Sequence, residues 1–278
     1  MKVLVTGSSG YVGKNLVRRL KARGIEVTTC DIKAVPPKSI SDITPISLSR
    51  MDAVVHLAAF SAIEQEWKHD RIIANNILAA NNIIKMVERE HKPLIFCSSS
   101  GVHQETERGP YVISKEFGEC IVRDRLEKYV IVRPSNIVGA TWMGGHDSLD
   151  NGHILPRLFD ATVMGKPFTL YGNGDQVRDY IHVGRVCSAV ETLLDDFPKT
   201  PLLMELCSGE ETSLSELLEI WKRNFGPIAI KYGSRRSDPK VLSSRRAIGE
   251  KLETTRDDLL QAIADYRFRY ERQSKAVT

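Results

Sequence analysis

The sequence lacks several features that mark secreted and membrane proteins. Its 278 residues contain five cysteines, an odd number without regular spacing, which favours reduced thiols over a disulfide framework. No hydrophobic run approaches the length of a membrane span, and the apolar stretch at 1–5 is too short for a signal peptide. We therefore expect a cytoplasmic protein.

The sequence also lacks a large excess of charge of one sign. The formal net charge is +4, and the basic pairs Arg235-Arg236 and Arg245-Arg246 fall far short of a basic stripe. This argues against a nucleic-acid partner, whereas a small basic patch suits a phosphate-bearing metabolite. There is no internal repeat, and we assign no metal site. With 42% hydrophobic and 27% charged residues, the composition is that of a globular enzyme with ample core.

A glycine-rich turn follows the first apolar run of the chain. Residues 2–5 read as a strand, Gly7, Gly10 and Gly13 follow it, and apolar residues at helical spacing continue over 14–23. Such a turn lets the backbone approach a pyrophosphate, whose charge is met by the amides and the positive dipole end of the helix. The pattern predicts a dinucleotide cofactor.

Asp31 sets the expected type of dinucleotide. It ends a second strand at 26–30 and lies 18 residues after the last glycine of the turn. A carboxylate there accepts hydrogen bonds from the adenosine ribose and repels a 2′-phosphate, which favours NAD over NADP. Lys33 weakens this preference. A nucleotide-triphosphate loop is excluded because Lys14 is followed by Asn15.

Strand and helix patterns alternate over the first half of the chain. This predicts an α/β fold with a Rossmann-type, doubly wound parallel sheet, which binds ligands beyond the carboxyl ends of its strands. After about residue 138, frequent glycines indicate a smaller, mostly helical lobe. We expect a cofactor-binding lobe over 1–137 and 182–206, and a substrate-binding lobe over 138–181 and 207–278. The expected strands are 3–5, 26–30, 53–57, 93–97 and 130–133, and the expected helices are 14–23, 70–90 and 111–128.

Tyr111 and Lys115 follow a run of three serines, Ser98, Ser99 and Ser100. Residues four apart share one face of a helix, so the lysine cation can lie beside the phenol. A tyrosine with a pKa of about 10 needs roughly 4 kcal/mol of stabilisation to act as a phenolate base near neutral pH. One cation at about 4 Å supplies roughly that amount at an effective dielectric near 20. The pair therefore predicts hydride chemistry on a bound nicotinamide.

Seven sequence blocks, in order, resemble the extended short-chain dehydrogenase/reductase family, in its NAD-dependent nucleotide-sugar epimerase/dehydratase branch. The resemblance runs nearly end to end. The blocks are the glycine turn, His56-Leu57-Ala58-Ala59, Asn76, Ser98-Ser99-Ser100, Tyr111 with Ser114-Lys115, Arg133-Pro134-Ser135-Asn136, and the segment from Tyr171 to Tyr180.

The resemblance implies roles for individual residues. Tyr111 would be the catalytic base and acid, Lys115 its electrostatic partner and ribose anchor, and Ser99 the hydroxyl that polarises the substrate oxygen, with Ser98 and Ser100 as competitors. The implied NAD-binding residues are Gly7, Ser9, Gly10, Tyr11, Val12, Gly13, Asp31, Ile32, Lys33, Leu57, Ala58, Ala59, Asn76, Tyr111 and Lys115. The implied residues for a nucleotide-diphosphate sugar are Ser99, Ser100, Asn136, His153, Arg178 and Arg236. A homodimer through the helices that contain Asn76 and Tyr111 is also implied.

Two departures from the family pattern bear on the reaction. Ser100 and Gly101 stand where related dehydratases and decarboxylases carry an acid, which favours a UDP-hexose 4-epimerase-like reaction through a keto-sugar. His103 stands where the family usually has tyrosine, and the 12-residue step from Ser99 to Tyr111 is about half the usual spacing. The sequence therefore does not assign the identity of the sugar substrate. The alternatives are a keto-sugar or aldehyde reductase of the same fold, and a non-catalytic nucleotide sensor.

Overall fold

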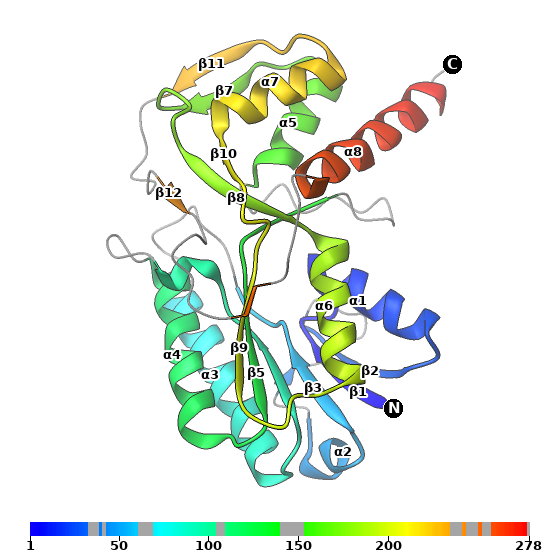
Figure 1. Ribbon diagram of the computed structural model, residues 1–278, viewed down its shortest axis with the longest axis vertical. Coiled ribbons are helices and arrows are strands. Elements are labelled where there is room, and N and C mark those ends of the chain that lie inside the picture. Colours follow the sequence, from blue (N-terminus) through cyan, green and yellow to red (C-terminus); the bar gives the residue numbers. More distant parts are fainter. Residues whose placement is uncertain are drawn as a thin grey trace.

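A seven-stranded parallel sheet dominates the structure (Figure 1). The computed structural model describes residues 1–32, 39–40, 43–60, 69–103, 109–139, 153–233, 241–242, 250–251 and 257–276. The strands of this sheet are β1 (Lys2–Thr6), β2 (Glu26–Cys30), β3 (Ala53–His56), β4 (Leu94–Cys97), β5 (Tyr129–Pro134), β9 (Leu202–Leu206) and β13 (Glu250–Lys251). Their spatial order is β13-β9-β5-β4-β3-β1-β2. The order reverses at β1, as in a doubly wound sheet, and this confirms the predicted fold class.

Helices cover both faces of the sheet (Figure 1). On one face, α1 (Tyr11–Ala22) packs beside α6 (Val183–Asp195), and on the other α3 (His69–Arg89) packs beside α4 (Pro110–Arg125). Because side chains alternate across a strand, Val3 and Val5 enter the core under α1 and α6, while Leu4 enters the core under α3 and α4. Burial on both faces explains why these strands read as continuous apolar runs.

The smaller lobe has a core of its own, built around the buried Trp221. Phe159, Tyr266 and Leu170 pack there from three different elements. Ser213 caps the helix that carries Trp221 by accepting a hydrogen bond from the Glu216 amide at 3.1 Å, as its sequence pattern predicts. The helices of this lobe are α5 (Ile154–Val163), α7 (Leu214–Phe225) and α8 (Asp257–Ala276), and its strands are β6 (Asn136–Val138), β7 (Phe168–Tyr171), β8 (Val177–His182), β10 (Glu211–Ser213), β11 (Ile230–Gly233) and β12 (Val241–Leu242).

Two short helical elements complete the described chain. α2 (Pro45–Ser49) lies between β2 and β3, and the 3₁₀ turn η3 (Ser100–His103) follows β4 directly. Across the described ranges, no helix has both the length and the apolar character needed to cross a membrane.

Candidate functional site

The glycine-rich turn lies between β1 and α1, at the carboxyl edge of the sheet. Gly7 has a φ of +70°, and a Cβ there would lie 2.6 Å from the amide nitrogen of Ala58. At Gly13 a Cβ would overlap the Gly7 carbonyl oxygen. The N-cap of α1 is Gly10, so no side chain of its own caps the first-turn amides. Tight backbone contact and open helix-end amides fit the pyrophosphate of a dinucleotide.

Asp31 faces this turn from the end of β2. Its Oδ2 accepts a hydrogen bond from the amide of Ser9 at 2.8 Å, which fixes the carboxylate beside the turn. Ile32 is 67% exposed at the same edge. Lys33, the residue expected to weaken the preference for NAD, lies outside the described residues.

Asn76 connects the segment after β3 to the helix that carries the tyrosine. Its Oδ1 accepts from the amide of Phe60 at 2.7 Å, and its Nδ2 donates to the Ser114 hydroxyl at 2.9 Å. The side chain is buried. Leu57, Ala58 and Ala59 end β3 at the edge that holds the glycine turn. The fold therefore brings these predicted cofactor residues together, and Asn76 links them to α4.

Ser99, Tyr111 and Lys115 meet at the carboxyl end of β4. Ser99 follows this strand, while the other two lie on the first turns of α4. The Ser99 hydroxyl accepts from the Gly101 amide at 3.1 Å and forms a hydrogen bond with the phenol of Tyr111. Lys115 Nζ donates to the Cys97 carbonyl at 2.6 Å and lies 5.8 Å from the centre of the Tyr111 ring.

Burial drives the ionisable groups of this site toward their neutral forms. It raises the pKa of Tyr111, an effect to which the nearby Cys97 adds and which the hydrogen bond from Ser99 opposes. It also lowers the pKa of Lys115, against the opposing influence of Cys97 and Glu119. The groups of the chain itself therefore hold the pKa of Tyr111 above its ordinary value, so the depression expected from Lys115 together with the nicotinamide ring stays a prediction for the cofactor-bound protein. The ammonium group is held by a backbone carbonyl, and the desolvation of the phenolate outweighs it.

His56 belongs to the packing of the site. Its Nδ1 lies 2.7 Å from the Thr6 hydroxyl, and its ring stacks on Phe96. Burial, together with the charge of Lys115, lowers the pKa of His56 to about 3. The ring is thus neutral at physiological pH, which suits a structural role beside the cofactor residues.

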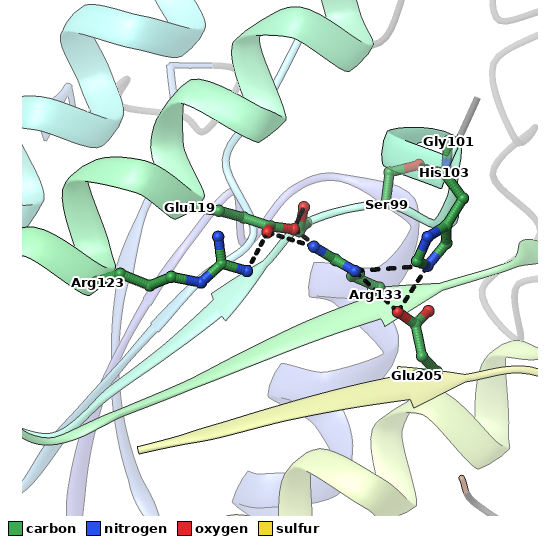
Figure 2. A network of polar contacts seen from close by, with 8 residues as sticks. Ser99, Gly101, His103, Glu119, Arg123, Arg133 and Glu205 are labelled. Atoms are coloured by element: carbon green, nitrogen blue, oxygen red, sulfur yellow. Dashed lines mark hydrogen bonds and ion pairs between the residues drawn. The ribbon is translucent and has the colours of Figure 1, made fainter. Parts of the chain in front are cut away.

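A buried charge network that sequence reasoning missed lies near Ser99 (Figure 2). Glu119, one turn after Lys115, accepts from the Ser98 hydroxyl at 2.6 Å and from Arg133 Nε at 2.7 Å. Arg133 also donates to Glu205 at 3.1 Å. The spacing of Glu119, four residues after Lys115, is the one sequence signal for this network, since it puts both on one helix face.

The residues predicted for the substrate are less closely grouped. Asn136 starts β6 and donates from Nδ2 to the Asp179 carbonyl at 3.0 Å. Arg178 lies on β8, the strand paired with β6, and donates to its neighbour's carbonyl at 2.9 Å. His153 is the N-cap of α5. Ser100 opens η3 beside Ser99. Arg236 lies outside the described residues.

Comparisons with known proteins agree with this geometry. The family model "NAD dependent epimerase/dehydratase family" matches residues 3–201. A UDP-glucose 4-epimerase of Lactobacillus helveticus is 30% identical over 87% of this chain and 88% of its own. A dTDP-4-dehydro-6-deoxy-D-allose reductase of a Streptomyces species is 25% identical over 77% of this chain and 78% of its own.

Solved structures show the same fold. MoeE5, determined in complex with UDP-glucose and NAD, has a TM-score of 0.81 and 22% identity, and the alignment covers 97% of this chain and 100% of that one. The prediction of NAD as cofactor is confirmed at the level of the family. The chain belongs to the NAD-dependent epimerase/dehydratase family.

Proposed function

We propose that the protein is a nucleotide-sugar epimerase of the UDP-hexose 4-epimerase type. The observation that carries this proposal is the placement of Ser99, Tyr111 and Lys115 at the same edge of the parallel sheet as the glycine turn, with no carboxylate directly after Ser99. Residues 100 and 101 are Ser and Gly in the tight turn η3. An elimination or decarboxylation step would call for an acid there, whereas epimerisation needs only reversible oxidation.

In this proposal Tyr111 transfers the proton, and Ser99 donates a hydrogen bond to one of the two oxygens between which the proton moves. Tyr111 takes the proton of a sugar hydroxyl, and the Ser99 hydroxyl, oriented by the Gly101 amide, donates toward the phenol or the sugar oxygen. Lys115 is held by the Cys97 carbonyl, from where its cation favours the phenolate. NAD, when bound, would supply a hydride acceptor and a positive charge. Tyr111 would hold the proton removed from the sugar hydroxyl and give it back when the oxidation is reversed, so that no net redox change results.

Asp31, Asn76 and the turn residues would hold NAD, and Asn136, Arg178, Arg236 and His153 would hold the sugar nucleotide. We assign the cofactor to a lobe formed by 1–137 and 182–206, and the sugar nucleotide to one formed by 138–181 and 207–278. The conformational change that returns the hydride needs a pocket that holds the nucleotide while the sugar turns. This division supplies separate supports for the two ligands.

We also propose a homodimer through α3 and α4. Leu78 on α3 is 58% exposed, and Ile113 and Phe117 on α4 are 45% and 46% exposed. Ile113 and Phe117 are four residues apart and so share one helix face. The two helices pack side by side on the outside of the sheet (Figure 1), which makes their outer faces one surface. Exposed apolar residues gathered in this way are typical of an interface.

The first experiment identifies any nicotinamide cofactor released on denaturation, and follows UDP-glucose and UDP-galactose interconversion by the native protein. Interconversion without added cofactor and without net NADH supports the epimerase. Consumption of added NADPH with a keto-sugar or aldehyde, without interconversion, identifies the reductase instead. Cofactor binding with neither activity would leave the sensor role.

Tyr111→Phe tests the assigned base. The variant should retain NAD and the sugar nucleotide but lose activity by about 10³-fold or more, since removal of a general base costs roughly 10²–10⁴-fold. Tyr129→Phe is the matched control, because Tyr129 begins β5 at the opposite end of the sheet. Isothermal titration and initial rates measure the two effects. Full activity of Tyr111→Phe would overturn the assignment.

A further inference from the structure

Glu205 is a fully buried carboxylate on β9, close to the catalytic candidates. Its relative exposure is 0%. Oε1 accepts from His103 Nε2 at 2.8 Å and from Arg133 Nη1 at 3.1 Å, while Oε2 is buried and has no hydrogen-bond partner among the described residues. A buried charge is costly unless it is paired and hydrogen-bonded. Glu205 therefore depends on the two donors at Oε1.

Arg133 forms most of its hydrogen bonds with a different carboxylate, that of Glu119. Its Nε and Nη2 bind the two oxygens of Glu119 at 2.7 and 2.6 Å, which leaves only Nη1 for Glu205. His103 must supply the second donor. Arg133 Nη1 also lies 3.4 Å from His103 Nε2, a longer contact in which Nε2 would be the acceptor. We assign the proton to Nε2, because its contact with Glu205 is shorter, at 2.8 Å, and Oε1 of Glu205 already accepts from Arg133. Figure 2 shows the His103 ring pointing from η3 toward Glu205, with Arg133 beside it.

The other end of η3 orients the catalytic serine. Within the turn, the Gly101 amide donates to the Ser99 hydroxyl at 3.1 Å and the Val102 amide donates to the Ser99 carbonyl at 3.3 Å. Val102 is buried, and a Cβ on Gly101 would lie 3.0 Å from Val112, next to Tyr111 on α4. The turn is thus fixed by packing on one side and by the His103 ring on the other.

We propose that His103 is a positioning residue that holds the Ser99 hydroxyl for proton transfer by anchoring η3 to Glu205. The inference rests on the proposed function of Ser99 and Tyr111. Two hydrogen bonds carry the effect, one from His103 to Glu205 and one from Gly101 to Ser99. The second uses a lone pair of the Ser99 oxygen and so turns its own proton toward the phenol.

The pH dependence of the reaction reports on this positioning. The titratable groups facing the Tyr111 phenol in the described part of the chain are Lys115 on its own helix and Cys97 at the end of β4, beside the Ser99 hydroxyl. The hydrogen bond from Ser99 lowers the pKa of Tyr111. If η3 loosens, that bond weakens and the pKa of Tyr111 rises. The acid limb of the kcat profile then moves to higher pH, which a purely structural defect would not produce.

A double-mutant cycle between His103 and Ser99 tests the inference. We expect His103→Ala to lower kcat about tenfold, the equivalent of one weakened transition-state hydrogen bond, with KM changed less than about twofold. In a Ser99→Ala background the same change should have almost no further effect on kcat. Independent, multiplicative losses would overturn the proposal.

Two conservative variants keep the test valid even where His103→Ala does not fold. The Gln amide nitrogen reaches the position of Nε2, so His103→Gln should retain most of kcat and an unmoved pH profile. The Asn amide nitrogen reaches only the position of Nδ1, so His103→Asn should behave like the Ala variant. Equal behaviour of Gln and Asn would contradict the anchoring role.

Hydrogen exchange of residues 99–103, followed by mass spectrometry, needs no substrate. Protection of this segment should fall in His103→Asn and persist in His103→Gln. Unchanged protection in both variants would refute the anchor. This result separates the inference from the proposed function. If protection changes as expected while the wild-type protein neither interconverts nor reduces sugars, the proposed function alone fails.

Discussion

At the scale of single residues, burial shifts the pKa values of the ionisable groups in the site toward their neutral forms. Burial lowers the pKa values of His56 and Lys115 and raises that of Tyr111. All three shifts favour the neutral form, so the described chain supplies little of the phenolate character that the reaction needs. A cationic ligand beside Tyr111 would therefore stabilise the phenolate more than it would in water, because the effective dielectric constant of the buried site is low.

His56 predicts a dependence of stability on pH. Its pKa is about 3 in the folded chain against the ordinary 6.5 of an exposed histidine, so the unfolded state binds more protons between these limits. The stability contributed by the neutral ring is present above pH 6.5 and is lost as the pH falls toward 3. The loss from this group should be about 2 kcal/mol between pH 7 and pH 5.

Urea unfolding of the wild type and of His56→Gln at several pH values measures the effect. The variant should show a flatter profile by about that amount, because glutamine does not titrate. Parallel profiles for the two proteins would show that His56 has the same pKa in the folded and unfolded states, which would contradict the prediction.

The catalytic candidates are predictable from sequence, because Ser99, Tyr111 and Lys115 combine a short spacing with chemistry that few residues supply. Glu205 is not predictable in this way. A lone acid in a strand usually faces solvent, and only the three-dimensional register of β5 with β9 puts it opposite Arg133. The position of Lys115 Nζ on the Cys97 carbonyl is likewise a tertiary result, which the helical spacing cannot specify.

At the scale of secondary-structure elements, α4 must lie very close to β4. Gly118, in the middle of α4, is buried, and a Cβ there would overlap the ring of Phe96 on β4. The close approach puts the first turns of α4, with Tyr111 and Lys115, beside the end of β4. The short distance between α4 and β4 that the site needs therefore depends on Gly118, although glycine is unfavourable in the middle of a helix.

Gly118→Ala should destabilise the protein by about 1–3 kcal/mol, because overpacking of the core outweighs the gain in helix propensity of about 1 kcal/mol. Chemical denaturation gives the free energy of unfolding. A second substitution, Phe96→Leu, should recover part of the loss, since it removes the ring that meets the new methyl group. A stabilised Gly118→Ala variant would mean that the helix can move away at no cost.

The five strands and three helices predicted in the first half were recognisable because the strands read as continuous apolar runs and the helices have apolar residues at helical spacing. α1 begins at Tyr11 rather than Lys14, since the N-cap is Gly10 within the glycine turn itself. The strands of the smaller lobe escaped prediction, and so did β9 and β13 of the large sheet. Several are only two or three residues long, as β12 (Val241–Leu242) and β10 (Glu211–Ser213) are, and within the described chain these two pair only with β8.

At the scale of the whole molecule, side-chain contacts join the cofactor turn to the smaller lobe. Tyr11 donates to the Gly139 carbonyl at 2.6 Å. Arg185 on α6 pairs with the buried Asp258 of α8 at 2.9 Å. These links cross between the two cores, so the lobes are held together by polar contacts as well as by chain connections.

The proposed homodimer gives a prediction at this scale. Phe117→Glu should convert a dimer into a monomer, since a charge on the shared face of α3 and α4 would be desolvated in the interface. Light scattering coupled to gel filtration measures the mass. Phe268→Glu is the matched control, because Phe268 on α8 is also exposed, at 57%, and lies outside the proposed interface. A monomeric wild-type protein would refute the dimer.

The order of strands in the large sheet has a consequence for biosynthesis. β5 finds its outer neighbour, β9, only at residues 202–206, after the strands β6 to β8 of the smaller lobe. While the chain emerges from the ribosome, the backbone of β5 stays an open sheet edge for the whole intervening stretch. Open edges recruit foreign strands. The half-made protein is therefore most exposed to aggregation, and to chaperone capture, at the strand that will later carry Arg133.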